Sequence, residues 1–95
     1  SPLPYYFLSL SSLPAALQKA IIIITDGEPD SRQKTDECAK IAQRNNIAIA
    51  TIGVQGADNT YLRRLSGDDN LSFKVDNIEK LSDTFGQAVE NLLRK

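Results

Sequence analysis

The stretch Ile21-Ile22-Ile23-Ile24-Thr25-Asp26-Gly27 decides the fold. Four consecutive β-branched residues favour a strand, and an unbroken apolar run is typical of a parallel strand covered on both faces. Asp30-Ser31 then predicts the N-cap of a helix that continues to Asn45-Asn46, and a second apolar run, Ile47–Ile52, follows at once. The order strand, helix, strand predicts two adjacent parallel strands with a right-handed crossover.

The rest of the chain continues this alternation. Asp58-Asn59 predicts the cap of a short helix that Gly67 ends, Leu71–Val75 predicts a third strand, and Asp76 with Glu79 forms a capping-box pattern before a last helix. The side chains expected to face the core are Ile22, Ile24, Ile49, Ile52, Tyr61, Leu62, Leu65, Ile78, Leu81, Phe85, Ala88 and Leu92. We therefore expect an α/β protein, a Rossmann-like three-layer fold with a small, mostly parallel sheet.

The first twenty residues fit this scheme less well. Tyr5–Leu10 predicts a strand and Pro14–Ala20 a two-turn helix. A crossover between parallel strands needs about a dozen residues or more, and fewer separate Ser12 from Ile21. Either the first segment is not a parallel neighbour of Ile21–Ile24, or residues are absent here relative to a complete domain.

Composition narrows the class of protein. The 95 residues are 41% apolar and 24% charged, which fits one domain over residues 1–95. Eleven basic and twelve acidic residues give a net charge of −1, so we expect no nucleic-acid partner and no binding to an anionic membrane. No apolar run approaches the roughly twenty residues of a membrane span.

The chain contains no histidine and a single cysteine, Cys38. This composition excludes an intramolecular disulfide, a Cys/His zinc site and a Ser-His-Asp triad. Cys38, Ile41 and Ala42 form the apolar stripe of the predicted helix, so we expect them to face the core and interpret Cys38 as a small buried apolar residue. A lone cysteine favours a reducing compartment such as the cytoplasm and leaves the location open.

The acidic loop Thr25–Asp30 is the candidate functional site. Ligand sites in parallel α/β sheets lie beyond the carboxyl ends of the strands, and Asp26, Glu28 and Asp30 meet in this loop. Oxygen ligands suit a hard cation such as Mg²⁺. The alternative is that Gly27 and Pro29 only form the turn and that Asp30 only caps the helix.

The segment Ile21–Gly27, the following helix, and the run Ile47–Val54 resemble the second half of a von Willebrand factor A domain. The order of Tyr61–Gly67, a last strand and an amphipathic helix agrees with this resemblance, which covers Ala20 to Lys95. It implies a protein–protein interaction module that holds Mg²⁺ at an adhesion-type site and binds an acidic group of its partner. Asp26 matches the family's aspartate in the Thr-Asp-Gly segment.

The other metal ligands of the family normally come from an Asp-x-Ser-x-Ser motif on the first strand and from a threonine on a middle loop. The nearest match is Ser9–Leu13, with Ser9 in place of the aspartate, Ser11 in place of the first serine and Leu13 in place of the second. Alternatively, Ser12–Leu17 corresponds to the family's Thr-Pro-Leu loop. The resemblance thus implies metal ligands Asp26, Ser9 and Ser11, a weak or vestigial site, and a partner surface of Thr25, Asp26, Gly27 and Glu28.

Three other functions stay open at this point. A Mg²⁺-dependent enzyme would use Asp26 and Glu28, but no nucleophile or positive clamp is visible, so we expect no enzyme. A dinucleotide-binding half-domain lacks the spaced glycines of a phosphate-binding loop. A truncated structural half-domain could self-associate as a homodimer, because a small sheet leaves an exposed edge.

Overall fold

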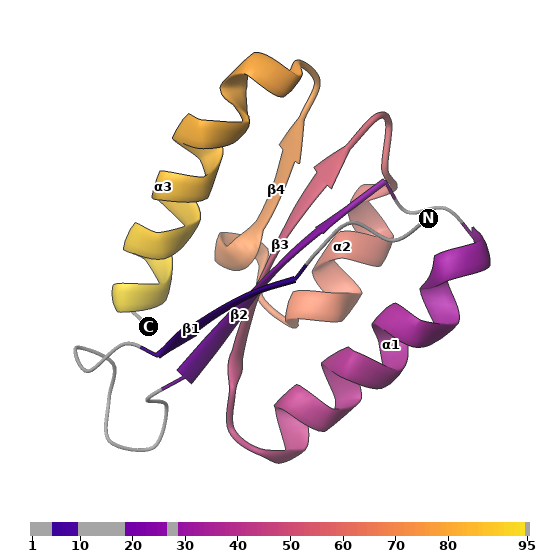
Figure 1. Cartoon of the computed structure of the whole chain (residues 1–95), viewed down its shortest axis with the longest axis vertical. Helices are drawn as coiled ribbons and strands as arrows, with labels where there is room; N and C mark the ends of the chain where they lie inside the picture. The colour runs from indigo at the N-terminus through magenta and orange to yellow at the C-terminus, as the bar shows by residue number, and fades with distance from the viewer. Residues whose placement is uncertain (1–4, 10–18, 27–28, 95) are drawn as a thin grey trace.

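The computed structural model describes residues 5–9, 19–26 and 29–94. Its strands and helices alternate along the chain (Figure 1). The elements are β1 (Tyr5–Ser9), β2 (Lys19–Thr25), α1 (Pro29–Arg44), β3 (Ala48–Val54), α2 (Asn59–Ser66), β4 (Ser72–Val75) and α3 (Leu81–Leu93), with short 3₁₀ helices η1 (Asp69–Leu71) and η2 (Ile78–Lys80).

The described strands form one sheet in the order β1-β2-β3-β4. β2, β3 and β4 are parallel, with Ile23 opposite Thr51 and Ile52 opposite Phe73. This arrangement confirms the predicted α/β fold and the parallel pairing of the two isoleucine-rich runs. β1 and β4 are the edge strands, so an edge-paired homodimer stays a prediction.

The first strand settles one of the open alternatives. β1 lies beside β2 but runs antiparallel to it, with Tyr5 opposite Ile23 and Ser9 opposite Lys19. An antiparallel neighbour needs no long crossover, which explains why so few residues join the two strands. The predicted helix Pro14–Ala20 is wrong at its end, because Lys19 and Ala20 begin β2, and its earlier residues lie outside the described part of the chain.

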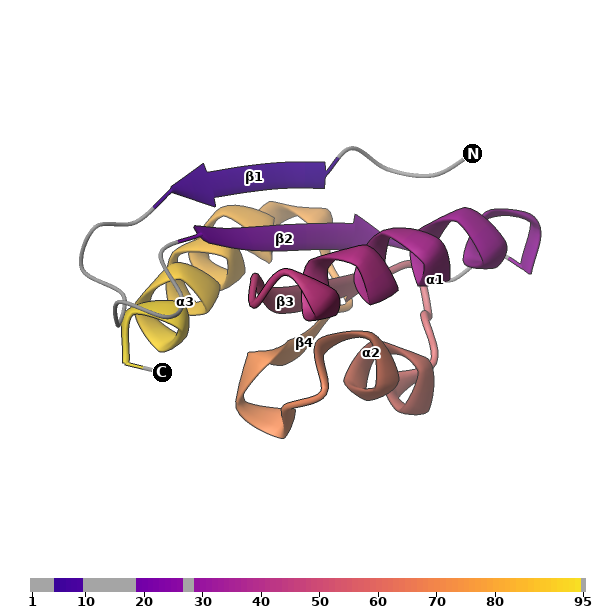
Figure 2. The ribbon, with the colours of Figure 1, turned by 90° about the horizontal axis from the view of Figure 1, so that it is seen from below.

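Helices cover both faces of the sheet, as Figure 2 shows. On the α3 face, one cluster contains the predicted core residues Ile22, Ile24 and Ile52, each at most 5% exposed. On the face of α1 and α2, Ile23 and Ile49 pack against Tyr61 and other buried side chains. This two-sided core confirms the three-layer architecture and explains the unbroken apolar run of β2. Among the described residues, no helix combines the length and the apolar composition that a membrane span needs.

The helix α2 forms as the sequence predicts. The Asp58 side chain accepts a hydrogen bond from the backbone N–H of Thr60 at 3.1 Å, which caps the first turn. Gly67 ends the helix with a φ of 71° and donates its N–H to the carbonyl of Arg63 at 2.8 Å. Tyr61, Leu62 and Leu65 are buried, as expected.

Two apolar side chains that were expected to be buried are exposed. Ile78 is 69% exposed because Asn77, and not Asp76, caps the next segment by accepting the Glu79 N–H at 3.0 Å. The capping-box interpretation is therefore wrong: Ile78 lies in a 3₁₀ turn and α3 begins only at Leu81.

Ile41 is 57% exposed because α1 buries Thr35, Ala39 and Ala42. These three residues follow one face at helical spacing, and Ile41 lies about 100° around the helix from Ala42. Cys38 is half-buried, so its interpretation as a core residue is only partly right.

Candidate functional site

The candidate site lies at the carboxyl edge of the parallel strands. β2 is an inner strand, paired with β1 on one side and β3 on the other, and it ends at Thr25. Thr25 is 3% exposed and lies opposite Gly53 in the register, while Asp26 is half-buried. Both residues take part in interactions within the fold. Asp26 is therefore a half-buried carboxylate at the end of an inner strand.

The loop after Asp26 is shorter than the sequence suggested. Gly27 and Glu28 lie outside the described residues, so their predicted roles stay predictions. α1 begins at Pro29, and Asp30 is inside its first turn. The prediction that Asp30 caps this helix is therefore wrong, since the helix starts before it. A proline suits the first helical position because its missing N–H would have no intrahelical partner there.

The structure does not bring Ser9 and Asp26 together. Ser9 pairs with Lys19 at the amino end of β2, whereas Asp26 follows the carboxyl end. At about 3.3 Å per residue, seven residue steps place these two positions about 23 Å apart. Ser11 lies outside the described residues. The predicted ligand set of Asp26 with Ser9 therefore fails, because β1 runs in the opposite direction to β2.

The remaining described groups at this edge decide how well a Mg²⁺ ion could bind. Mg²⁺ takes one or two protein carboxylates in an octahedron of oxygens and keeps several waters. Thr25 and Asp26, which are consecutive in the sequence, contain one hydroxyl and one carboxylate. The described residues contain no group of three or more acidic, cysteine or histidine side chains suited to a metal ion. The described groups thus fit only part of a Mg²⁺ site.

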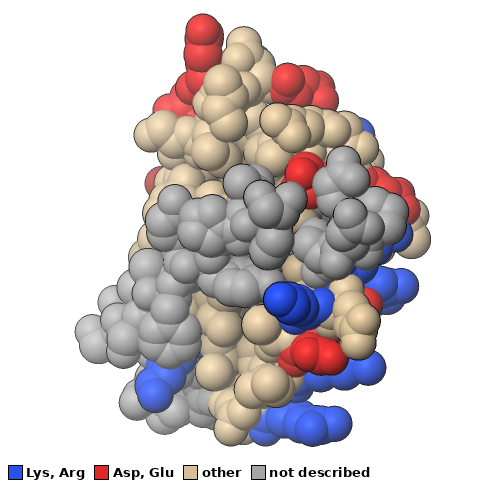
Figure 3. Space-filling model, turned by 45° about the vertical axis from the view of Figure 1, so that its right-hand side comes forward, with Lys and Arg blue, Asp and Glu red and all other residues tan. Residues whose placement is uncertain are grey.

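Two further aspartates share this edge, which the sequence reading did not notice. Asp58 follows β3 after the turn at Gln55-Gly56, and Asp76 directly follows β4. Because the three strands are parallel, Asp26, Asp58 and Asp76 all lie beyond their carboxyl ends. In Figure 3, acidic side chains gather at the top, the carboxyl edge, and basic side chains lie mostly below. The sequence contained a signal for this acidic edge, since an aspartate follows each of the three expected parallel strands within a few residues.

An apolar groove lies beside the acidic edge. The described residues that line it are Ile24, Ile78, Leu81, Ser82 and Phe85, and its volume is about 470 Å³. Ile24 comes from β2, two residues before Asp26, and the others come from η2 and α3. The groove exists because Ile78 turns outward, so the sequence reading, which placed Ile78 in the core, could not find it.

The face of α1 and α2 carries a second polar arrangement. The Arg32 guanidinium lies 4.4 Å and the Arg64 guanidinium 5.1 Å from the centre of the Tyr61 ring. Arg64 also approaches Asp36 at 3.4 Å. Burial raises the pKa of the Tyr61 hydroxyl, and Asp36 raises it further. These contacts fasten the two helices to each other, which is a structural role.

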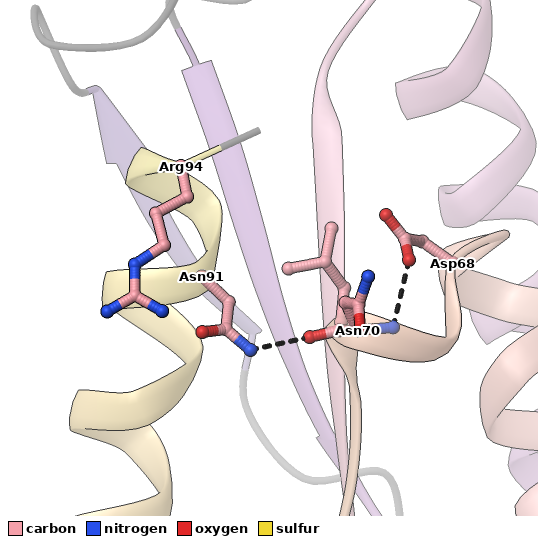
Figure 4. Close-up of a pocket in the computed structure, with 5 residues that line it drawn as sticks. Asp68, Asn70, Asn91 and Arg94 are labelled. Atoms are coloured by element: carbon pink, nitrogen blue, oxygen red, sulfur yellow. Dashed lines mark hydrogen bonds between the residues drawn. The ribbon is translucent and has the colours of Figure 1, made fainter.

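A cavity of about 340 Å³ lies at the opposite, amino edge of β4 (Figure 4). Asn91 of α3 donates to the Asn70 carbonyl at 2.8 Å, and the Asn70 N–H donates to Asp68 at 2.9 Å. Arg94 extends along α3, with its guanidinium 3.9 Å from Glu90. Because these polar groups bond to one another, the cavity joins α3 to η1 and does not resemble a ligand site.

The comparisons with known proteins agree with this architecture. A sequence model of the von Willebrand factor type A domain family matches residues 5–87. This match includes β1, which the resemblance in the sequence left outside. The collagen alpha-5(VI) chain of Mus musculus is 33% identical over 82 residues, and the collagen alpha-6(VI) chain of Homo sapiens is 32% identical over 76 residues.

These alignments cover 86% and 80% of this chain but only 3% of each collagen chain. The chain therefore spans a small fraction of the length of these relatives. A solved structure of proximal thread matrix protein 1 from the mussel byssus superposes with a TM-score of 0.65 at 20% identity. It covers 78% of this chain and 19% of the mussel protein, and this likeness supports the fold alone.

Proposed function

This chain belongs to the von Willebrand factor type A domain family, and on that premise we propose that it is a protein–protein interaction module. Its partner contacts the carboxyl edge of the sheet at Thr25 and Asp26 and at the adjoining Gly27 and Glu28. The observation that carries the proposal is the position of Asp26, a carboxylate at the end of an inner parallel strand. Binding sites in such sheets lie at this edge.

The edge is suited to binding because its support is rigid. β2 is hydrogen-bonded to a strand on each side, and Thr25 is buried next to Asp26. A carboxylate held in this way loses little conformational freedom when a partner binds, which favours affinity. No observation on the described residues favours the alternative of a Mg²⁺-dependent enzyme, so we propose binding and no catalysis.

We also propose that Asp26 retains a weak, adhesion-type affinity for Mg²⁺. A bound Mg²⁺ would supply a positive centre that attracts an acidic group of the partner. This chain would contribute the Asp26 carboxylate, beside the buried Thr25 hydroxyl. With Ser9 at the far end of β2, the described residues supply few ligands for such a site. Millimolar affinity, equivalent to about −4 kcal/mol, is therefore the expected upper limit.

The proposal is tested by capture of a partner followed by direct binding of the purified partner. The variant Asp26→Asn removes the charge at the proposed surface with almost no change in shape. The matched control is Asp69→Asn, because Asp69 lies in η1 at the opposite edge and its side chain is 82% exposed. Its ion pair with Arg63 spans 3.9 Å at the surface and contributes little to stability.

We expect one identified protein to bind the wild type and Asp69→Asn equally and to bind Asp26→Asn at least tenfold more weakly, both by titration calorimetry. Equal affinity for all three proteins would place the partner surface elsewhere. If no captured protein binds directly when purified, the interaction module itself is refuted.

A further inference from the structure

The apolar groove at the carboxyl edge is open in a single copy of this chain. Its described lining, which we call the Ile78 groove, is Ile24, Ile78, Leu81, Ser82 and Phe85. Ile78 is 69% exposed, more than any other large apolar side chain in the described residues. An isoleucine held in water on a short 3₁₀ turn gives up the stabilisation that burial would bring. Covering the groove with another apolar surface would therefore be favourable in free energy.

Acidic residues surround the Ile78 groove. Asp76, Glu79 and Asp83 are all exposed and lie within five residues of Ile78, against two exposed bases in the same range, Lys74 and Lys80. Asp26 and Asp58 extend the same negative edge along the neighbouring strands. Figure 3 shows acidic side chains at this end of the molecule. The groove thus favours an occupant that combines an apolar side chain with positive charge.

This chain carries such a surface on α1. Ile41 is 57% exposed, and its exposed neighbours Lys40 and Arg44 are basic. Lys40, Ile41 and Arg44 form what we call the Ile41 face, which also has one acid within a helical turn, Glu37. α1 and α3 cover opposite faces of the sheet (Figure 2). The Ile41 face of a molecule therefore cannot reach its own Ile78 groove.

We propose that copies of this chain associate head to tail, with the Ile41 face of one copy seated in the Ile78 groove of the next. The contact covers both exposed isoleucines and sets Lys40 and Arg44 against Asp76, Glu79 and Asp83. The two surfaces differ, so the contact is heterologous and each dimer leaves one groove and one face open for further copies. This self-association uses the Ile78 groove and the Ile41 face, whereas the proposed partner surface is centred on Thr25 and Asp26.

Sedimentation equilibrium of the 95-residue protein tests the proposal, from about 10 μM to 1 mM. The wild type should increase in average mass with concentration, and added salt should reduce this increase because it screens the charged contacts. Ile41→Asp and Ile78→Asp should each associate about 10- to 100-fold more weakly, the loss expected for one buried isoleucine. Leu93→Asp is the matched control, since Leu93 is 40% exposed and lies outside both surfaces.

Mixing the two variants gives the decisive result. Ile41→Asp keeps an intact groove and Ile78→Asp keeps an intact face, so an equimolar mixture should form a 1:1 dimer that does not grow further. Thermal unfolding confirms that each variant is folded, which we expect because both positions are exposed. A wild type that stays monomeric overturns the proposal. So does self-association that both single variants retain, which would indicate pairing through the β1 edge instead.

Discussion

Replacement of Ile23 by alanine tests the two-sided core most directly. Ile23 is 1% exposed and packs on the face of α1 and α2 against a cluster that includes Ala39, Ile49 and Leu65. Removing buried carbons from an isoleucine in a packed core costs about 2–5 kcal/mol, which combines the transfer term with the cavity left behind. At about 0.05–0.15 kcal/mol per residue, a domain of 95 residues has about 5–14 kcal/mol in total. The substitution therefore removes a large share of the stability.

Urea unfolding followed by far-ultraviolet circular dichroism measures this change. The matched control is Ile78→Ala, which deletes the same atoms from a side chain that is 69% exposed and should change stability by less than about 0.5 kcal/mol. At about 4–8 °C per kcal/mol, Ile23→Ala should also lower the Tm by at least about 8 °C. A loss below about 1 kcal/mol, or a loss equal to that of the control, would refute the two-sided core around β2.

Three further predictions follow from particular contacts. Gly53→Ala should cost about 1–3 kcal/mol in urea unfolding, because its Cβ would lie 2.5 Å from Leu62 Cδ1, whereas Gly86→Ala meets nothing within 4 Å and should cost nothing. Burial raises the pKa of the Tyr61 hydroxyl above its usual value, so the folded state favours the neutral phenol. The stability that Tyr61 contributes is therefore complete below about pH 10, the usual pKa in the unfolded chain, and is lost as the pH rises through the higher pKa of the folded state. Thermal unfolding at a series of alkaline pH values should therefore show a smaller decrease of the Tm with pH for Tyr61→Phe than for the wild type. An equal decrease in both proteins would contradict this prediction. Calorimetric titration with Mg²⁺ should give weak saturable binding that Asp26→Ala abolishes, and identical flat titrations for both proteins would exclude the residual metal site.

The sequence predicted those parts of the fold that depend on strong local signals. The isoleucine run of β2 has no helical period, and its β-branched side chains suit a strand covered on both faces. The short helix α2 was predicted at both ends, because Asp58 caps it and Gly67 adopts the left-handed conformation that ends it. These residues act on their immediate neighbours, so their effect can be read without knowledge of the tertiary structure.

The wrong predictions concern places where either of two neighbouring residues could cap a helix or face the core. Asp76 and Asn77 are both good caps, and the structure uses Asn77, which moves the start of α3 to Leu81 and turns Ile78 outward. Ile41 and Ala42 are both apolar, and α1 turns Ala42 inward. The sheet selects between these alternatives through close packing, since the smaller Ala42 lets the helix approach the strands. Local periodicity cannot resolve a choice that depends on the distance to another layer.

At the candidate site, the prediction depended on the direction of each strand. Asp26, Asp58 and Asp76 reach one edge because β2, β3 and β4 are parallel, and the alternation of strands and helices predicted that direction. The short connection before β2 indicated either that β1 is not a parallel neighbour or that residues are absent, and the five residues of β1 did not decide between these two possibilities. A parallel β1 would have brought Ser9 to Asp26, whereas the antiparallel β1 carries Ser9 to Lys19. The direction of this one strand therefore keeps Ser9 away from Asp26, and the carboxyl edge carries the aspartates Asp26, Asp58 and Asp76 among the residues that the structure describes.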